Sequence, residues 1–298
     1  MKMRTSVLLI AGVFLLVLPP SLVQGKIRPG LEMVLYYPFD EGGGKTVEDK
    51  SETEADGKIF GSPEWVEGKF GGALRLNHDG INKNDDVVVR QGDYVSSREH
   101  DRLAFPSNDP ITIMAWIYGD QWDNHDNAIV YNWPEGQGTQ ANYGFRIEQR
   151  AELGDKGGDV ALFYRDAADA DWHRVTSREP VDGIPLREWH HVAATNTPGD
   201  PETQKVYWNG EELPVAFSHG NGKFKAIGSD GPVHIGARGW KPGARDFRGR
   251  LDEVSIWRGI FTAEELKEIA QAPTIEFLSV EAQGKLAASW GAIKRGRR

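Results

Sequence analysis

The chain has 298 residues and a formal net charge of −9, which argues against nucleic-acid binding because that function needs clustered Lys and Arg. It contains no Cys, which excludes disulfides, thiolate metal ligands and a thiol nucleophile. A chain of this length can bury a core without such crosslinks, as one large all-β domain or as two small domains.

Residues 1–25 have the layout of a secretory signal peptide. Lys2 and Arg4 precede an uninterrupted apolar run, Val7–Leu18, which is short for a membrane span of about 20 residues. We expect cleavage after Gly25, giving a secreted, cell-surface or periplasmic protein without a membrane span. The alternative is an uncleaved signal anchor.

Short runs of β-branched and aromatic residues, separated by Gly, Pro, Asn and Asp clusters, predict strands along most of the remaining chain. The predicted strands are Met33–Phe39, Ala73–Asn77, Asp86–Arg90, Ile111–Tyr118, Ala128–Asn132, Tyr143–Gln149, Asp159–Arg165, Trp189–Thr195, Lys205–Trp208, Glu212–Ala216, Val233–Gly236 and Arg250–Trp257. Asn209 and Gly210 are a strong signal for a tight hairpin. Many short strands and few helices predict a sandwich or a barrel.

One helix is predicted near the end of the chain. Thr262 and Glu265 form a capping-box pattern, apolar residues follow at helical spacing, and Pro273 ends the helix. Residues 273–298 then form an extension with a basic tail, which we interpret as solvated rather than as a patch for an anionic surface. Its strand-like pieces are Ile275–Val280 and Lys285–Trp290.

A series of short motifs follows a fixed order along the chain: Leu35–Gly42, Asp49–Gly57, Gly68–Leu74, Ile111–Ile117, Trp189–Ala193, Val206–Glu212 and Phe247–Trp257. Each motif is weak alone, but together they resemble the LamG-like jelly-roll family of the concanavalin A-like lectin/glucanase superfamily. The resemblance implies an all-β jelly-roll sandwich of two antiparallel sheets with one short C-terminal helix, formed by residues 26–272. It also implies that the strand at Met33–Phe39 lies beside the strand at Arg250–Trp257.

The resemblance further implies a structural calcium ion (Ca2+) that joins the first loop to the last strand. The residues that match are Asp49, Asp56 and Asp252. Carboxylate oxygens are hard ligands that suit calcium. The alternative is that these acidic residues only cap turns.

Three long polar stretches, Asn77–Leu103, Gly119–Asn142 and Ala151–Asp171, depart from the family pattern as expanded loops. Such loops either determine binding specificity or are inert surface. Aromatic residues near them are candidates for stacking on sugars, with carboxylates and amides fixing hydroxyl groups. The ligand-binding candidates are Trp122, His125, Trp133, Tyr143, Trp172 and Trp240. The alternative is that these rings pack the loops onto the sheet.

Signatures of catalysis are missing from the sequence. There is no E-x-D-x-x-E pattern of jelly-roll glucanases, and the adjacent Asp252 and Glu253 should face opposite ways on a strand. His190 and His191 should also face opposite ways, one packed and one half-exposed, and so should not share a zinc ion.

Our interpretation is therefore a secreted, non-catalytic binding module that recognises an extracellular carbohydrate or a protein surface. The alternatives are a glycan-degrading enzyme of the same superfamily with an unrecognised site, or a purely structural cell-surface module.

Overall fold

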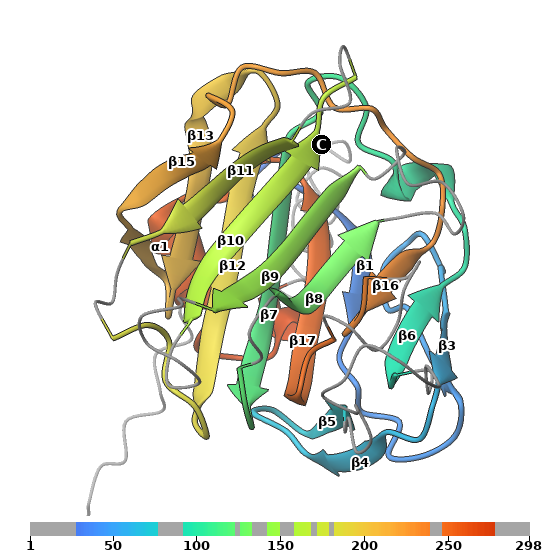
Figure 1. The fold of residues 1–298 in the computed structure, drawn as a ribbon. Helices are drawn as coiled ribbons and strands as arrows, with labels where there is room; N and C mark the ends of the chain where they lie inside the picture. The colour runs from blue at the N-terminus through green and yellow to red at the C-terminus, as the bar shows by residue number, and fades with distance from the viewer. Residues whose placement is uncertain are drawn as a thin grey trace, which may run out of the picture.

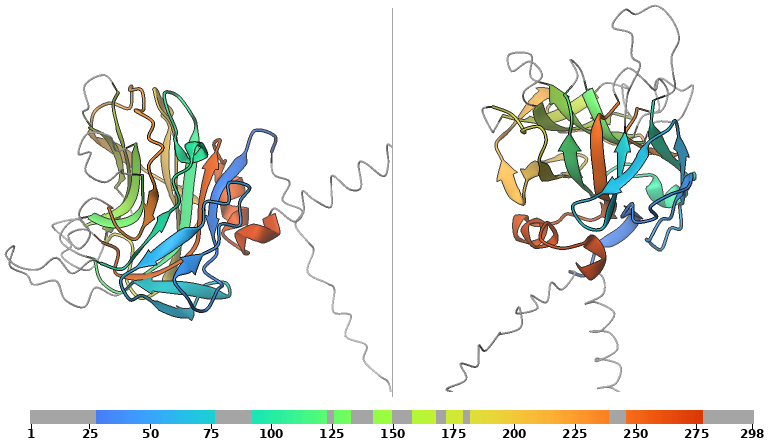
Figure 2. Two further views of the ribbon diagram at one scale, coloured as in Figure 1. Left: turned by 90° about the vertical axis from the view of Figure 1, so that its right-hand side faces the viewer. Right: turned by 90° about the horizontal axis from the view of Figure 1, so that it is seen from below.

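The computed structural model describes residues 28–76, 92–122, 126–132, 142–149, 158–167, 172–178, 182–238 and 246–277. Over these residues the chain is mostly strand, and the strands form two antiparallel sheets that pack face to face (Figures 1 and 2). This arrangement confirms the predicted jelly-roll sandwich. None of the helices in the described part is long and apolar enough to cross a membrane.

Sheet A contains, in spatial order, β14 (Glu211–Leu213), β13 (Asp200–Trp208), β12 (Trp189–Thr197), β7 (Ile111–Gly119), β17 (Gly249–Arg258), β5 (Gly72–Leu76) and β4 (Glu64–Glu67), and β1 (Glu32–Tyr37) also pairs with β17. Sheet B contains β15 (Val215–His219), β11 (Trp172–Ser177), β10 (Gly158–Arg165), β9 (Tyr143–Gln149), β8 (Asp126–Asn132), β16 (Val233–Ile235), β6 (Tyr94–Ser97), β3 (Gly57–Phe60) and β2 (Thr46–Val47). A short 3-10 helix, η1 (Asp101–Leu103), follows β6.

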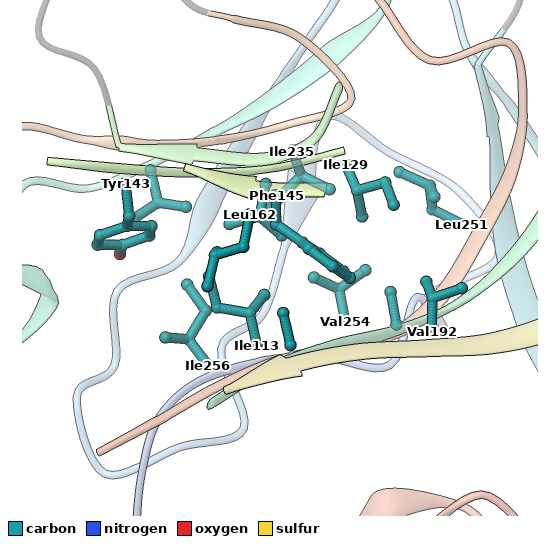
Figure 3. Packing of buried hydrophobic residues seen from close by; sticks show 14 of the residues in the cluster. Ile113, Ile129, Tyr143, Phe145, Leu162, Val192, Ile235, Leu251, Val254 and Ile256 are labelled. Carbon is teal, nitrogen blue, oxygen red and sulfur yellow. The ribbon is translucent and has the colours of Figure 1, made fainter. Parts of the chain in front are cut away.

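Alternation along the strands divides each sheet into an inner and an outer face. In β9, for example, Tyr143, Phe145 and Ile147 point into the sandwich, and the residues between them point outward. Side chains of both sheets meet in one apolar layer (Figure 3). Burial of each such side chain stabilises the fold by about 1.5–3 kcal/mol, so this layer is what holds the two sheets together.

The predicted hairpin after β13 is confirmed. Asn209 and Gly210 both adopt positive φ, at 51° and 79°, as a two-residue hairpin turn requires. β14 returns along β13 in sheet A, whereas β15 pairs with β11 in sheet B. Pro214, which stands between β14 and β15, thus marks the point where the chain crosses from one sheet to the other.

The predicted neighbourhood of the first and last strands is also confirmed, because β1 pairs antiparallel with β17. β17 contains a bulge that the sequence pattern did not predict: its register against β7 shifts between Asp252 and Ser255, and Glu253 adopts a φ of 53°. The extra residue turns both Asp252 and Glu253 to the outer face of sheet A. The expectation that these two acids face opposite ways is therefore wrong.

α1 (Ala263–Ile269) covers part of the outer face of sheet A (Figure 2). Its predicted capping box is present, since the Thr262 hydroxyl accepts from the amide of Glu265 and the Glu265 carboxylate accepts from the amide of Thr262. Buried apolar side chains join the helix to the sheet; they include Tyr36, Met114, Trp257, Phe261, Leu266 and Ile269.

The residues after Pro273 form a helical turn at 274–277 rather than the start of the predicted strand Ile275–Val280. The turn is attached to the sheet by Glu253, whose carboxylate accepts hydrogen bonds from the Tyr36 hydroxyl at 2.9 Å and from the Thr274 amide at 2.6 Å. A buried polar anchor thus replaces strand pairing here.

The other differences from the predicted strands are small. Strands β2, β3, β4, β6 and β11 were not predicted. The predicted strands Asp86–Arg90 and Lys285–Trp290, like the proposed leader, lie outside the described residues.

Candidate functional site

The outer face of sheet B carries a polar cluster at its centre, on β8, β9 and β10, which lie side by side (Figure 1). Arg146 of β9 points outward between two small cross-strand neighbours, Ala128 of β8 and Ala161 of β10. Because neither neighbour has a long side chain, the guanidinium group can lie along the sheet.

Arg146 is held by three polar groups and one aromatic ring. Its Nη1 donates to the carboxylate of Asp126 at 2.8 Å and to the hydroxyl of Tyr131 at 3.2 Å, and its Nη2 lies 3.5 Å from the carboxylate of Glu148. Its Cζ lies 4.9 Å from the centroid of the Phe163 ring. The side chains of Arg146 and Asp126 are each only 7% exposed, so their geometry is fixed by burial.

Two further guanidinium groups surround this pair. Arg174 of β11 donates to Glu148 at 2.7 Å and to the Ser218 hydroxyl at 2.6 Å. Arg238 lies 3.7 Å from Asp126 and over the ring of Tyr131. We call the residues Asp126, Tyr131, Arg146, Glu148, Phe163, Arg174 and Arg238 the sheet B cluster. The side chains of Glu148 and Arg174 are 24% and 26% exposed, so these two are its most accessible charged members.

The central groups of the cluster, Arg146 and Tyr131, have shifted pKa values. Burial lowers the pKa of the Arg146 guanidinium, but Tyr131, Asp126 and Glu148 raise it by more, so the net shift is upward. Burial also raises the pKa of the Tyr131 phenol, which therefore stays neutral. Both carboxylates of the cluster are engaged by guanidinium groups, an arrangement that suits fixed hydrogen bonding better than proton transfer.

Two of the predicted stacking residues lie in the core instead of on the surface. Trp122 is 1% exposed, packs against Phe247 and donates from Nε1 to the carbonyl of Ile184 at 2.9 Å. Tyr143 is fully buried and donates to the carbonyl of Leu103 at 3.2 Å. Neither ring presents a face to solvent, so neither can stack on a sugar in this structure.

The structure does not describe the side chains of the other stacking candidates. His125, Trp133 and Trp240 lie outside the described residues. Trp172 belongs to β11, where its backbone pairs with Arg165 at the end of β10. Trp172 remains a candidate.

Asp49 and Asp56 accept hydrogen bonds that stabilise the loop after β1. The Asp49 carboxylate accepts four hydrogen bonds of 2.9 Å, from the amides of Tyr36, Ser51 and Ala55 and from the Ser51 hydroxyl. Asp56 accepts from the amide of Asp49 at 3.0 Å. This pattern is the turn-capping alternative of the sequence analysis.

Asp252 belongs to a different group. Its Oδ2 accepts from the amides of Lys69 and Phe70 at 2.8 and 3.0 Å, and its buried Oδ1 has no hydrogen-bond partner. Within the described ranges, no group of three acidic or histidine side chains could hold a metal ion. The oxygens of Asp49 are occupied by donors and Asp252 lies apart, so these residues do not fit the calcium site that the resemblance implied.

His190 and His191 face opposite sides of sheet A, as predicted, but both are buried. His190 accepts from Nε1 of Trp208 at 3.1 Å, and His191 packs against Trp116. Burial lowers the pKa of both imidazoles, that of His191 to about 3. The expected half-exposed histidine is absent from this pair, because His190 points into the sandwich and His191 packs against the ring of Trp116.

The sheet B cluster was missed by the sequence reasoning, although the sequence contains a signal for it. Arg146 and Glu148 alternate with apolar Phe145 and Ile147 in β9. Such alternation places charged residues on the outer face of a strand. The contacts to Arg174 and Arg238 could not be predicted, since they depend on strand register.

Solved structures resemble this fold at low sequence identity. The binding domain of Paraclostridial Mosquitocidal Protein 1 matches with a TM-score of 0.57 and 15% identity over 80% of this chain and 52% of that chain. Domain 4 of AbnA, a GH43 extracellular arabinanase from Geobacillus stearothermophilus solved with arabinotriose, matches with a TM-score of 0.55 and 19% identity over 81% and 100%.

The binding domain of botulinum neurotoxin serotype G matches with a TM-score of 0.55 and 12% identity over 80% of this chain and 50% of that chain. This chain thus spans about half of the toxin binding domains and all of the arabinanase domain. Among curated proteins, none matches the sequence. A profile of the concanavalin A-like lectin/glucanases superfamily matches residues 90–267, which is more than half of the chain. The chain therefore belongs to the concanavalin A-like lectin/glucanase superfamily.

Proposed function

We propose that this chain is an exported, non-catalytic module that binds carbohydrate through the outer face of sheet B. The observation that carries the proposal is the sheet B cluster, in which guanidinium and carboxylate groups gather at the centre of one sheet and two of them, Glu148 and Arg174, are accessible. Such groups bind the hydroxyls of sugars.

The structural relatives support this ligand class. Domain 4 of the arabinanase was solved with arabinotriose, and the binding domain of botulinum neurotoxin DC was solved with SialylT, at a TM-score of 0.51 to this chain. The fold alone does not determine a ligand, so the cluster has to supply the specificity here.

Within the cluster the residues have different roles. Glu148 and Arg174 are the accessible charged groups and would contact hydroxyls of the sugar. Arg146 is a positioning residue, because it is buried and fixes Asp126 and Glu148 through its two terminal nitrogens. The engagement of both carboxylates by guanidinium groups supports the non-catalytic interpretation.

The test is a binding titration of the chain with a panel of neutral and acidic oligosaccharides, arabinotriose included. We expect Arg174→Gln to weaken binding about tenfold by removing charge-assisted hydrogen bonds. The matched control is Lys205→Gln, which removes the ion pair with Glu212 on the outer face of sheet A, the opposite side of the sandwich. The control should bind as the unchanged protein does.

Equal binding by Arg174→Gln and the unchanged protein would contradict the sheet B site. If no oligosaccharide of the panel bound and a protein partner were captured instead, the result would favour recognition of a protein surface. Release of shorter sugars from the panel would overturn the non-catalytic interpretation.

A further inference from the structure

The outer face of sheet A carries two cations stacked on neighbouring aromatic rings. Trp116 and Tyr118 point outward from β7, two positions apart. The Nζ of Lys69 lies 4.4 Å from the centroid of the Trp116 ring, and the Cζ of Arg250 lies 4.5 Å from the centroid of the Tyr118 ring. The two cations therefore occupy successive outward rows, which are about 7 Å apart on a strand.

Each row continues onto β12. His191 pairs with Trp116 and Trp189 pairs with Tyr118, both with ring centroids 5.6 Å apart. We call the residues Lys69, Trp116, Tyr118, His191, Trp189 and Arg250 the sheet A array. Trp116 and His191 are buried and form its floor, whereas the other members are half-buried or exposed. Trp189 is half-buried and thus available at the surface.

The cations of the array are not neutralised. No carboxylate of the described residues pairs with Lys69 or Arg250, whereas Arg75, the cross-strand neighbour of Arg250, is paired with Asp120 at 3.0 Å and Glu64 at 3.4 Å. The array is therefore locally cationic, in a chain whose formal net charge is −9. A local charge opposite to that of the whole chain selects for an anionic ligand.

The buried acid beside Trp116 does not offset the array. Asp252 pairs with Trp116 across the strands, but burial raises the pKa of its carboxyl to about 8. At neutral pH the group is mostly protonated, so it adds little negative charge beneath Lys69.

We propose that the sheet A array binds an acidic glycan, a saccharide that bears carboxylate or sulfate groups. Ammonium and guanidinium groups form charge-assisted hydrogen bonds with such oxyanions, and the half-buried Trp189 offers an apolar ring on which a sugar can stack. Trp189 and Arg250 lie on strands separated by β7, about 10 Å apart, a span that exceeds one sugar ring and so fits an oligosaccharide.

This proposal shares with the proposed function only the ligand class, a glycan. The two binding surfaces are separate, because the array lies on sheet A and the cluster lies on sheet B. The experiment titrates the chain with polygalacturonate for carboxylates, with heparin for sulfate esters and with dextran as a neutral glycan. We expect Lys69→Gln and Arg250→Gln each to weaken acidic-glycan binding about fivefold, and high salt to weaken it further.

The matched control is Lys58→Gln, because Lys58 also stacks on an aromatic ring, that of Phe60 at 5.1 Å, but belongs to sheet B. It should bind as the unchanged protein does, and Arg250→Lys should restore part of the affinity lost in Arg250→Gln. A melting curve of each variant checks that the variant is folded. Whichever acidic glycan binds identifies the oxyanion.

Unchanged acidic-glycan binding in both Gln variants would overturn the proposal, and so would the absence of binding to either acidic glycan. The experiment also separates this proposal from the proposed function. If only the sheet B site were wrong, Arg174→Gln would leave all glycan binding intact, while Lys69→Gln and Arg250→Gln would still weaken binding of the acidic glycan.

Discussion

At the scale of single residues, the bulge in β17 decides which charges the outer face of sheet A contains. A regular strand would place Asp252 and Glu253 on opposite faces. The extra residue places both carboxyls on one buried face, where burial raises the pKa of each and Glu253 adds to the rise at Asp252. Glu253 has the Tyr36 hydroxyl and the Thr274 amide as donors, whereas Asp252 has an oxygen without a partner. Asp252 is therefore the more strained of the two.

This difference predicts a pH-dependent effect of Asp252→Asn. Burial, together with nearby Glu253, raises the pKa of Asp252 from 3.8 to about 8. A raised pKa in the folded state gives a stabilisation that is complete below about pH 4 and is lost as the pH rises to about 8. Asn cannot ionise, so denaturant titrations at pH 8 should show the variant to be more stable by about 1–3 kcal/mol.

The comparison is made as the difference between the variant and the unchanged protein at each pH. Burial lowers the pKa of His191 to about 3 and that of His234 to about 4, so both destabilise the fold as the pH falls below about 6.5 in either protein. The control is Asp49→Asn, which should lower stability at every pH, because an amide nitrogen cannot accept the hydrogen bonds of Asp49. A constant difference across the pH range for Asp252→Asn would contradict the assignment.

At the scale of secondary-structure elements, α1 depends on both its cap and its apolar face. Leu266 and Ile269 are buried against the outer face of sheet A, and Thr262 closes the capping box with Glu265. Arg28 pairs with Glu265 at 2.8 Å, so the start of the described chain contacts the same turn. This ion pair is half-exposed and should contribute little beside the cap.

Removal of the cap should therefore have a measurable cost. Thr262→Ala leaves the amide of Glu265 without its acceptor and should lower the free energy of unfolding by about 1 kcal/mol. The control is Glu268→Ala, an exposed position of the same helix, which should change stability by less than about 0.5 kcal/mol. Equal denaturation midpoints for Thr262→Ala and the control would show that the helix is held by packing alone.

The elements also show where sequence reasoning succeeds and where it fails. Strands with clear alternation, such as β7 and β9, were predicted because one face of each is apolar. The missed strands β2, β3 and β4 have two to four residues and lie at sheet edges or in turn-rich sequence, so their pairing partners rather than their own residues define them. The capping box was predictable because it is local.

Candidate site residues were harder to predict because burial depends on distant contacts. Trp122 follows a Gly and an Asp in a loop-like sequence, yet Phe247, far along the chain, covers its ring. Arg146 could have been found from alternation, but its partner Asp126 is opposite Glu148 only through the register of β8 with β9. Sequence patterns thus indicate which face of a strand a side chain lies on, whereas the pairing of strands determines which side chains contact one another.

At the scale of the whole molecule, contacts between the first and last strands of the described fold close the sandwich. β1 pairs with β17, so the first and last strands of the fold share backbone hydrogen bonds. The loop after β1 is fixed by the four hydrogen bonds that Asp49 accepts, one of them from the amide of Tyr36 in β1 itself. A metal ion at Asp49 would have to displace these donors before it could bind.

Calcium should therefore not stabilise the fold through Asp49, Asp56 and Asp252. A ligand that binds only the folded state stabilises it by RT ln(1 + L/Kd), where L is the free ligand concentration, and so raises the melting temperature when it is in excess over its Kd. We expect the Tm to be the same in excess calcium and in excess chelator. The Tm of Asp56→Asn should likewise not depend on calcium, because Asp56 accepts a hydrogen bond from the amide of Asp49. A Tm that falls with chelator and returns with calcium would contradict this prediction. If that dependence on calcium then disappeared in Asp252→Asn, the unpartnered oxygen of Asp252 would be a calcium ligand.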